Sequence, residues 1–187
     1  MNLQQALAET RVSEFRYFDS IGSTNDEALR WLTEGAPDLA LVIADEQTKG
    51  RGRFDRHWVT LSESSLAFSL ILTTTFIEAR KIPLYAPLGG IAVQEVVKNL
   101  LGLDTRIKWP NDVLLNNRKF CGILVEAAWQ GSDLLGVVMG IGINVSEGSL
   151  PSPAQQNFPA TSLETACGYP VDRFELLKHV INAIDNW

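Results

Sequence analysis

Hydrophobic positions repeat along this chain with two different periods, one typical of helices and the other typical of strands. Residues 174–187 carry apolar side chains at three- and four-residue intervals after Asp172, a residue type that commonly caps helices. Residues 39–44 and 65–74 contain short apolar runs of the kind found in buried strands. The pattern therefore predicts a chain in which helices and strands are mixed.

The order of these elements predicts the fold class. Helices are predicted from Ser23 to about Gly35 and at residues 1–10, 83–101, 161–166 and 174–187. Strands are predicted at residues 15–18, 39–44, 65–74, 106–109, 113–115, 120–128 and 134–145, with turns at 116–117 and 131–132 and a loop at 146–160. Because helices and hairpin-linked strands alternate irregularly, we expect an α+β domain with a mixed sheet and helices packed on one face.

Composition and charge narrow the classes of protein to which the chain can belong. Its 187 residues, 45% hydrophobic and 20% charged, are typical of one soluble globular domain. The net charge of −6 argues against nucleic acid as a partner, since phosphate binding needs an excess of lysine and arginine. No apolar run has the length of a membrane span, and the N-terminus does not resemble a signal peptide. With two cysteines in no metal-binding spacing, the expected location is the cytoplasm.

One short segment concentrates positive charge in this acidic chain. Residues 50–58 read GRGRFDRHW, and the residues of interest are Gly50, Arg51, Gly52, Arg53, Arg56 and Trp58. Glycine lets the backbone approach a ligand closely, and guanidinium groups pair with phosphate or carboxylate oxygens. The tryptophan can stack on a planar base. The segment is therefore a candidate anion site, although a basic loop exposed only to water has a similar composition.

Two further segments place polar residues beside turns and strand ends. In KWPND, Lys108 precedes a proline that is followed by Asn111 and Asp112. An aspartate beside an amide suits Mg²⁺ bound to phosphate, but the same residues also suit an ordinary turn between strands. In RKFCGILVE, Lys119 lies at the entrance of an apolar strand, close to Gly122. This lysine is a candidate to contact a carboxylate under activation, or alternatively to protect the edge of the strand.

The fourth segment, GIGINV, contains Gly140, Gly142 and Asn144 within a predicted strand. Glycines in a strand mark a place where a ligand or another backbone comes close. The segment lacks the strand-to-helix context of a dinucleotide-binding motif. The sequence also contains no phosphate-binding P-loop, so ATP would need a different kind of site.

Taken in this order, the four segments resemble those of the biotin protein ligases (biotin–acetyl-CoA-carboxylase ligases) over about residues 15–187. The segment GRGRFDRHW is similar to the most specific motif of that family. The resemblance implies a catalytic domain over residues 1–187, with a fold like that of class II aminoacyl-tRNA synthetases. It also implies an enzyme that activates biotin with ATP and Mg²⁺ to biotinyl-5′-AMP. The biotin is then transferred to a lysine of a biotin carboxyl carrier protein.

The same resemblance implies roles for individual residues. The implied biotin-binding residues are Ser23, Thr24, Asn25, Gln47, Gly50, Arg51, Gly52, Arg53, Lys119 and Gly122. The implied nucleotide-binding residues are Arg53, Arg56, Trp58, Lys108, Asn111 and Asn144. The implied catalytic residues are Arg51, Lys108, Asp112 and Lys119, and Asp112 is also the expected metal ligand.

Two departures from the family pattern bear on function, and two alternatives stay open. The strand predicted at Phe15 begins too early for the DNA-binding domain of repressor members, so we expect a ligase without a repressor role. The chain also ends before the family's small C-terminal β domain, which we expect to be missing. A homodimer is compatible with the family, although no residue indicates it. The alternatives are a lipoate or octanoyl ligase of the same fold and a biotin-binding domain without catalysis.

Overall fold

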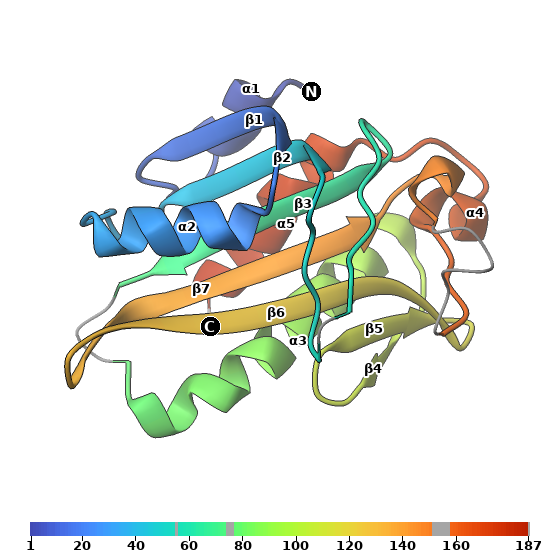
Figure 1. The fold of residues 1–187 in the computed structure, drawn as a ribbon. Helices are drawn as coiled ribbons and strands as arrows, with labels where there is room; N and C mark the ends of the chain where they lie inside the picture. Colours follow the sequence, from blue (N-terminus) through green and yellow to red (C-terminus); the bar gives the residue numbers. More distant parts are fainter. Residues whose placement is uncertain (55, 74–76, 151–157, 187) are drawn as a thin grey trace.

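A computed structural model describes residues 1–54, 56–73, 77–150 and 158–186. Within these residues, seven strands form one sheet in the order β1-β2-β3-β7-β6-β5-β4 (Figure 1). The strands are β1 (Phe15–Ile21), β2 (Leu41–Gln47), β3 (Ser65–Leu72), β4 (Arg106–Lys108), β5 (Asp112–Leu115), β6 (Arg118–Gln130) and β7 (Asp133–Asn144). Strands β1 and β2 are parallel, and the other neighbours are antiparallel. The predicted mixed sheet is therefore confirmed.

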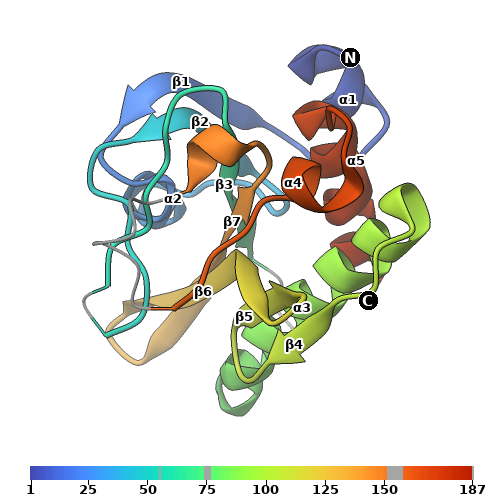
Figure 2. The ribbon, with the colours of Figure 1, turned by 90° about the vertical axis from the view of Figure 1, so that its right-hand side faces the viewer.

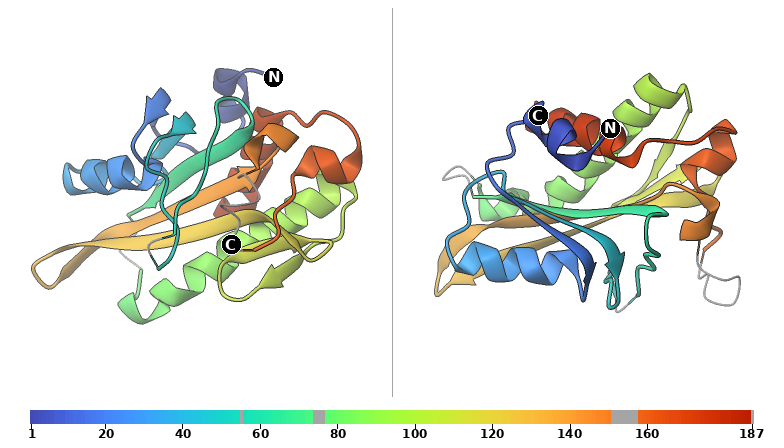
Figure 3. Two further views of the ribbon diagram at one scale, coloured as in Figure 1. Left: turned by 45° about the vertical axis from the view of Figure 1, so that its right-hand side comes forward. Right: turned by 90° about the horizontal axis from the view of Figure 1, so that it is seen from above.

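Helices cover both faces of this sheet. They are α1 (Leu3–Ala8), α2 (Thr24–Thr33), α3 (Ile82–Leu101), α4 (Leu163–Cys167) and α5 (Arg173–Asp185), with short 3₁₀ turns at Ala79–Lys81 and Glu147–Ser149. Helices α3 and α5 pack together on one face with α1 beside α5, whereas α2 lies against the opposite face (Figures 2 and 3). The one-face arrangement expected from sequence thus holds for α1, α3 and α5. Helix α2 goes to the second face because β3 is buried at every position and needs cover on both sides.

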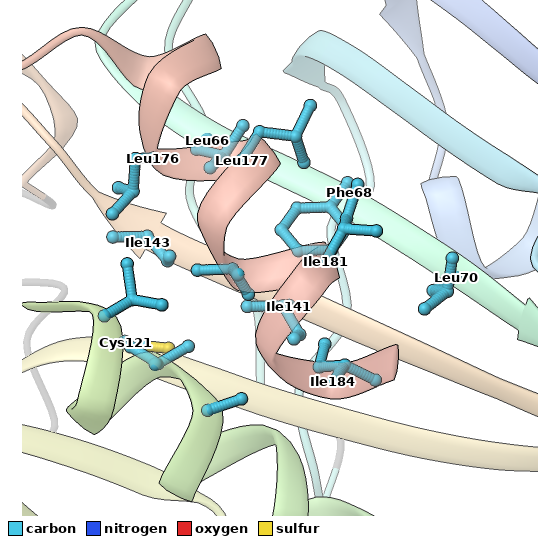
Figure 4. Packing of buried hydrophobic residues seen from close by; sticks show 14 of the residues in the cluster. Leu66, Phe68, Leu70, Cys121, Ile141, Ile143, Leu176, Leu177, Ile181 and Ile184 are labelled. Atoms are coloured by element: carbon cyan, nitrogen blue, oxygen red, sulfur yellow. The ribbon is translucent and has the colours of Figure 1, made fainter. Parts of the chain in front are cut away.

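The central strands present different residues to the two faces, because side chains alternate along a strand. On β3, Leu66, Phe68 and Leu70 point into the core under α5, beside Ile141 and Ile143 of β7 (Figure 4). On the α2 face, three alternate positions of β3 are small or polar, and the register pairs Ser65 with Asn144, Ala67 with Gly142 and Ser69 with Gly140, whereas Ile71 packs against α2. Small side chains leave this face hollow beside α2.

The element boundaries differ from the predicted ones mainly where long-range pairing extends a strand. Strand β1 continues to Ile21 because it pairs in parallel with β2 as far as Gln47. Strands β6 and β7 are likewise longer at their hairpin. The predicted turn at 116–117 is confirmed, since Asn116 and Asn117 both have positive φ. Residue 74, residues 151–157 and Trp187, which three of the predicted elements include, lie outside the described residues.

Two further features of the fold bear on membrane insertion and on cysteine chemistry. No helix in the described part of the chain is both long and apolar enough to cross a membrane. Cys121 packs in the main hydrophobic core, and burial raises the pKa of its thiol. This environment suits a packing role for Cys121 rather than nucleophilic chemistry.

Removing the N-cap of α5 should lower the free energy of unfolding in a pH-dependent way. Asp172 accepts hydrogen bonds from the backbone N–H groups of Phe174 (2.9 Å) and Glu175 (3.1 Å), and its carboxylate lies 2.6 Å from the ammonium of Met1. Burial raises the pKa of Asp172, but these contacts outweigh it and hold the pKa below the ordinary value. We expect Asp172→Ala to cost about 1 kcal/mol near neutral pH.

The pH dependence follows from the lowered pKa. The ionised carboxylate stabilises the fold above its unfolded pKa of about 3.9, and this contribution is lost as the pH falls through the lower folded pKa. Denaturant unfolding at neutral and acidic pH measures the effect, and Asp172→Asn is the control because asparagine also caps helices. An Asp172→Ala difference that stays constant down to about pH 2 would contradict this account.

Candidate active site

A cavity of about 520 Å³ opens on the hollow face of the sheet. Its walls come from the start of α2, from β6 and β7, and from residues 51–54 and 56–58. We call residues 50–54 and 56–58 the arginine arm. The arm folds back on itself: the N–H of Trp58 donates to the carbonyl of Gly50 (2.9 Å), and the N–H of Gly52 donates to the carbonyl of Arg56 (2.7 Å). A Cβ at Gly50 would lie 2.3 Å from the carbonyl oxygen of Trp58, so this turn requires glycine.

The indole of Trp58 lies on a pair of glycines in the floor of the cavity. Gly122 and Gly142 are direct partners across β6 and β7. A Cβ at Gly142 would lie 2.3 Å from Cε2 of Trp58, and one at Gly122 would lie 3.2 Å from Cζ3. The close approach inferred from these glycines is thus an approach of the tryptophan ring. Its buried Nε1 has no hydrogen-bond partner among the described residues, so it can donate to a ligand.

A polar network joins the start of α2 to the sheet. The hydroxyl of Ser69 lies 2.8 Å from Oγ1 of Thr24 and 2.6 Å from Oδ1 of Asn25, so it can donate to either. The carboxamide oxygen of Gln47 accepts from both the backbone N–H (2.8 Å) and the hydroxyl (3.1 Å) of Thr24. A Cβ at Gly140 would lie only 2.0 Å from Oδ1 of Asn25. Glycine at this position therefore lets α2 begin against the sheet.

The first arginine of the arm is held by two carboxylates. Nη1 and Nη2 of Arg51 donate to the two oxygens of Glu126 at 2.9 and 2.7 Å, and Nη2 also lies 2.7 Å from Asp26. The hydrogen bond with Glu126 raises the pKa of Arg51 above its ordinary value, although partial burial opposes the shift. Glu126 also accepts from Nδ2 of Asn25 at 2.8 Å. The arm is thereby tied to the network at the start of α2.

A second group of polar side chains lies where β5 meets β6. Nζ of Lys119 is 2.6 Å from Oδ1 of Asp112 and 5.5 Å from the centroid of the Trp58 ring. This buried Oδ1 has no partner among the described residues other than that ammonium. Nη1 of Arg53 donates to Oδ1 of Asn111 at 3.3 Å, and Nδ2 of Asn111 donates to the carbonyl of Ile123. Two cations and a carboxylate therefore face one end of the cavity.

Comparisons with known proteins now assign the family. A sequence model of the biotin/lipoate A/B protein ligase family matches residues 17–144. The chain belongs to this family. It is 38% identical over 165 residues to the bifunctional ligase/repressor BirA of Bacillus spizizenii, which covers 88% of this chain and 50% of that protein. It is 35% identical over 170 residues to the biotin–acetyl-CoA-carboxylase ligase of Paracoccus denitrificans, which covers 88% and 69% respectively.

Solved structures of the family agree with the sheet and helices described above. The biotin protein ligase from Aquifex aeolicus in complex with biotin and ATP superimposes with a TM-score of 0.78 at 29% identity. The match covers 93% of this chain and 69% of that one. These findings confirm the predicted family and fold. The chain spans about half the length of the BirA protein that it matches.

Most residues that the ligase resemblance singled out converge on the cavity. Its lining includes Ser23, Thr24, Asn25, Gln47, Arg51, Gly52, Arg53, Arg56, Trp58, Asn111, Asp112, Lys119, Gly122 and Asn144. Gly50 and Lys108 do not line it. Gly50 shapes the arm instead, and exposed Lys108 places Nζ 3.7 Å from the ring centroid of Phe158, which does line the cavity. Their predicted ligand contacts stay predictions.

Other residues of this ligase-family site were missed by sequence reasoning. Ser69 carried a usable signal, because SLAFSL alternates small and large residues and marks one face for a cavity. Glu126 carried a weaker one, as a carboxylate within an apolar strand. Asp26 and Phe158 carried none, since their partners Arg51 and Lys108 lie far away in sequence.

Proposed function

We propose that this chain is an ATP-dependent biotin–protein ligase. It would activate biotin to biotinyl-5′-AMP and transfer the biotin to a lysine of a biotin carboxyl carrier protein. The observation that carries the proposal is a single cavity that joins the polar start of α2 to the cations Arg53 and Lys119. The biotin ligases named among the relatives support the choice of biotin over lipoate.

The layout of the cavity suits a molecule with a polar head, an apolar tail and a carboxylate. Ser23, Thr24 and Gln47 offer hydrogen-bonding groups at the start of α2, next to Gly140. Gly142, two residues and about 7 Å further along the strand, lies beneath Trp58. Lys119 lies beside that ring. We place the ureido ring at the α2 end, the aliphatic chain between Gly140 and the Trp58 ring, and the carboxylate near Lys119.

Two successive displacements make up the proposed reaction. A carboxylate oxygen of biotin attacks the α-phosphorus of ATP, and the bond to pyrophosphate breaks. The amine of the acceptor lysine then attacks the acyl carbon, AMP leaves, and the amine loses a proton. In the first step, the cations of Lys119 and Arg53 reduce repulsion between the two anions and stabilise the charge that develops at phosphorus. The arm shields the adenylate from water.

Mg²⁺ would be the metal of this reaction, and the residues fit such an ion. Oδ1 of Asp112 is buried and has no partner among the described residues apart from the ammonium of Lys119, so it can serve as one oxygen ligand. Mg²⁺ usually takes one or two carboxylates together with phosphate oxygens and water. The ion would neutralise phosphate charge, while Asn111 orients Arg53 toward the same end of the cavity.

Residues 1–187 would act as the catalytic domain in the cytoplasm, and a homodimer remains part of the proposal.

The proposed activity is tested by calorimetric titration with biotin, then with biotin and MgATP while pyrophosphate is measured. We expect biotin binding followed by pyrophosphate release. Binding without release would indicate a biotin-binding domain without catalysis. Binding of lipoate or octanoate in preference to biotin would overturn the substrate assignment.

Replacing Arg53 with alanine should let the adenylate escape. Arg53 is a cation of the arm that lines the cavity; its guanidinium donates to the neutral side chain of Asn111 at 3.3 Å and lies over the ring of Phe54. Losing one charge-assisted contact should weaken retention by about tenfold. Release of biotinyl-5′-AMP into solution, separated by chromatography without acceptor, measures this loss. Arg80→Ala, an exposed arginine on the 3₁₀ turn before α3, is the control. If Arg53→Ala leaks no more than wild type, this role is wrong.

A further inference from the structure

The contacts of Arg51 are those of an anchor rather than those of an anion-binding group. The side chains of Arg51, Glu126 and Asp26 together carry one net negative charge, and both ends of the guanidinium edge are engaged. A phosphate or carboxylate placed there would meet repulsion. Arg53, only two residues away, is paired with a neutral amide and keeps its positive charge available. Arg51, at the root of the arm, and Arg53, nearer its tip, therefore have different roles.

Glu126 is the residue through which the root of the arm meets the cavity wall. Its Oε2 accepts from Nη2 of Arg51 at 2.7 Å and from Nδ2 of Asn25 at 2.8 Å. The carboxamide of Asn25 is fixed further by the hydroxyl of Ser69 (2.6 Å) and by the carbonyl of Leu124 (3.2 Å). One half-buried carboxylate thus orients a wall residue at the start of α2 and the arginine that carries the arm.

We propose that Glu126 is a positioning residue that couples a filled cavity to a closed arginine arm. The inference rests on the proposed function, because it takes biotin as the molecule that fills the cavity. A ligand at the start of α2 restrains Asn25, Asn25 and Arg51 share the same carboxylate oxygen, and Arg51 sets where the arm leaves the wall. Glu126 itself touches neither substrate, so it acts through Arg51 and Asn25.

The variant Glu126→Gln tests this role with little change in volume. It removes the negative charge that holds Arg51. Glutamine also has a single side-chain oxygen, so it cannot accept from both Nη atoms of Arg51 and from Asn25 as the carboxylate does. The matched control is Glu27→Gln, since Glu27 is also a carboxylate in a partly buried ion pair, with Arg16 at 2.8 Å and Arg30 at 2.6 Å, but these partners belong neither to the arm nor to the cavity wall. Both variants lose one carboxylate, so their melting temperatures should fall similarly.

Tryptic cleavage at the arginines of the arm gives a readout that does not depend on activity. Without ligand, we expect Glu126→Gln to be cut about tenfold faster than wild type and Glu27→Gln. Equal cleavage rates in the two variants would contradict the anchoring role of Glu126, whichever ligand the chain binds. Biotin should slow cleavage of wild type strongly and of Glu126→Gln weakly.

Calorimetry and steady-state kinetics complete the experiment. We expect the biotin affinity of Glu126→Gln to fall about tenfold, with KM for biotin rising in parallel and kcat changing less than about threefold. A fall in kcat with unchanged KM would overturn the positioning role.

Glu126→Gln combined with Arg51→Ala should bind biotin no worse than Arg51→Ala alone, because the two residues act as a unit. Additive losses of affinity would contradict this. If wild type binds no biotin, the proposed function fails, and ligand-free cleavage still decides the anchor.

Discussion

Replacing Lys119 with alanine should slow adenylate formation by about 100- to 1,000-fold, equivalent to roughly 3–4 kcal/mol of transition-state stabilisation. Nζ of Lys119 lies 2.6 Å from Asp112 and next to Trp58, at the end of the cavity where two anions must approach each other. Its removal takes away the cation and also leaves a buried carboxylate without its counter-charge. Both changes increase repulsion at the reacting atoms. Single-turnover pyrophosphate release measures the rate.

Two controls separate the causes of this loss. Arg118→Ala removes the neighbouring, exposed cation and should leave the rate near that of wild type. Lys119→Ala combined with Asp112→Asn removes the unpaired negative charge as well. If the double variant recovers most of the rate, the lysine serves mainly to neutralise Asp112. A Lys119→Ala rate within about threefold of wild type would remove Lys119 from the catalytic residues.

Replacing Gly140 with alanine should weaken biotin binding by about 100-fold while leaving most of the fold intact. The new Cβ would lie 2.0 Å from Oδ1 of Asn25, far inside ordinary contact distance. Asn25 must therefore move by about 1 Å, and a displacement of that size in a binding group can reduce function by about 100-fold. The hydrogen bonds from Asn25 to Glu126 and from Ser69 to Asn25 would be strained by the same shift.

Calorimetric titration with biotin and thermal unfolding test this expectation together. Gly22→Ala is the matched control, because a Cβ at Gly22 meets no atom of the described residues within 4 Å and the residue precedes the same helix start. We expect this control to bind biotin as wild type does. Wild-type affinity in Gly140→Ala would mean that Asn25 does not shape the binding site. A variant that no longer unfolds cooperatively would show that the clash breaks the sheet.

Much of the chemistry was predictable from short segments. The motif GRGRFDRHW, the lysines and the strand glycines depend on residue types at fixed local spacing, and most of the residues they indicated line one cavity. The strong periodicity of residues 174–187 likewise predicted α5 to within about two residues. Lys108 is different, since nothing in KWPND indicates that its side chain turns toward Phe158.

The sequence by itself determined the alternation of elements and the mixed sheet, because these follow from local periods of 2 and 3.6 residues. Through their resemblance to the ligase family, its motifs also indicated most of the residues that line the cavity. Only the tertiary structure decided which side chains of the site contact one another. Arg51 meets Glu126 across 75 positions, and Asn25 meets Gly140 where α2 packs on β7. A shift of one residue in β6 or β7 would turn these side chains to the opposite face. Such pairings depend on how distant strands align, which no local pattern records.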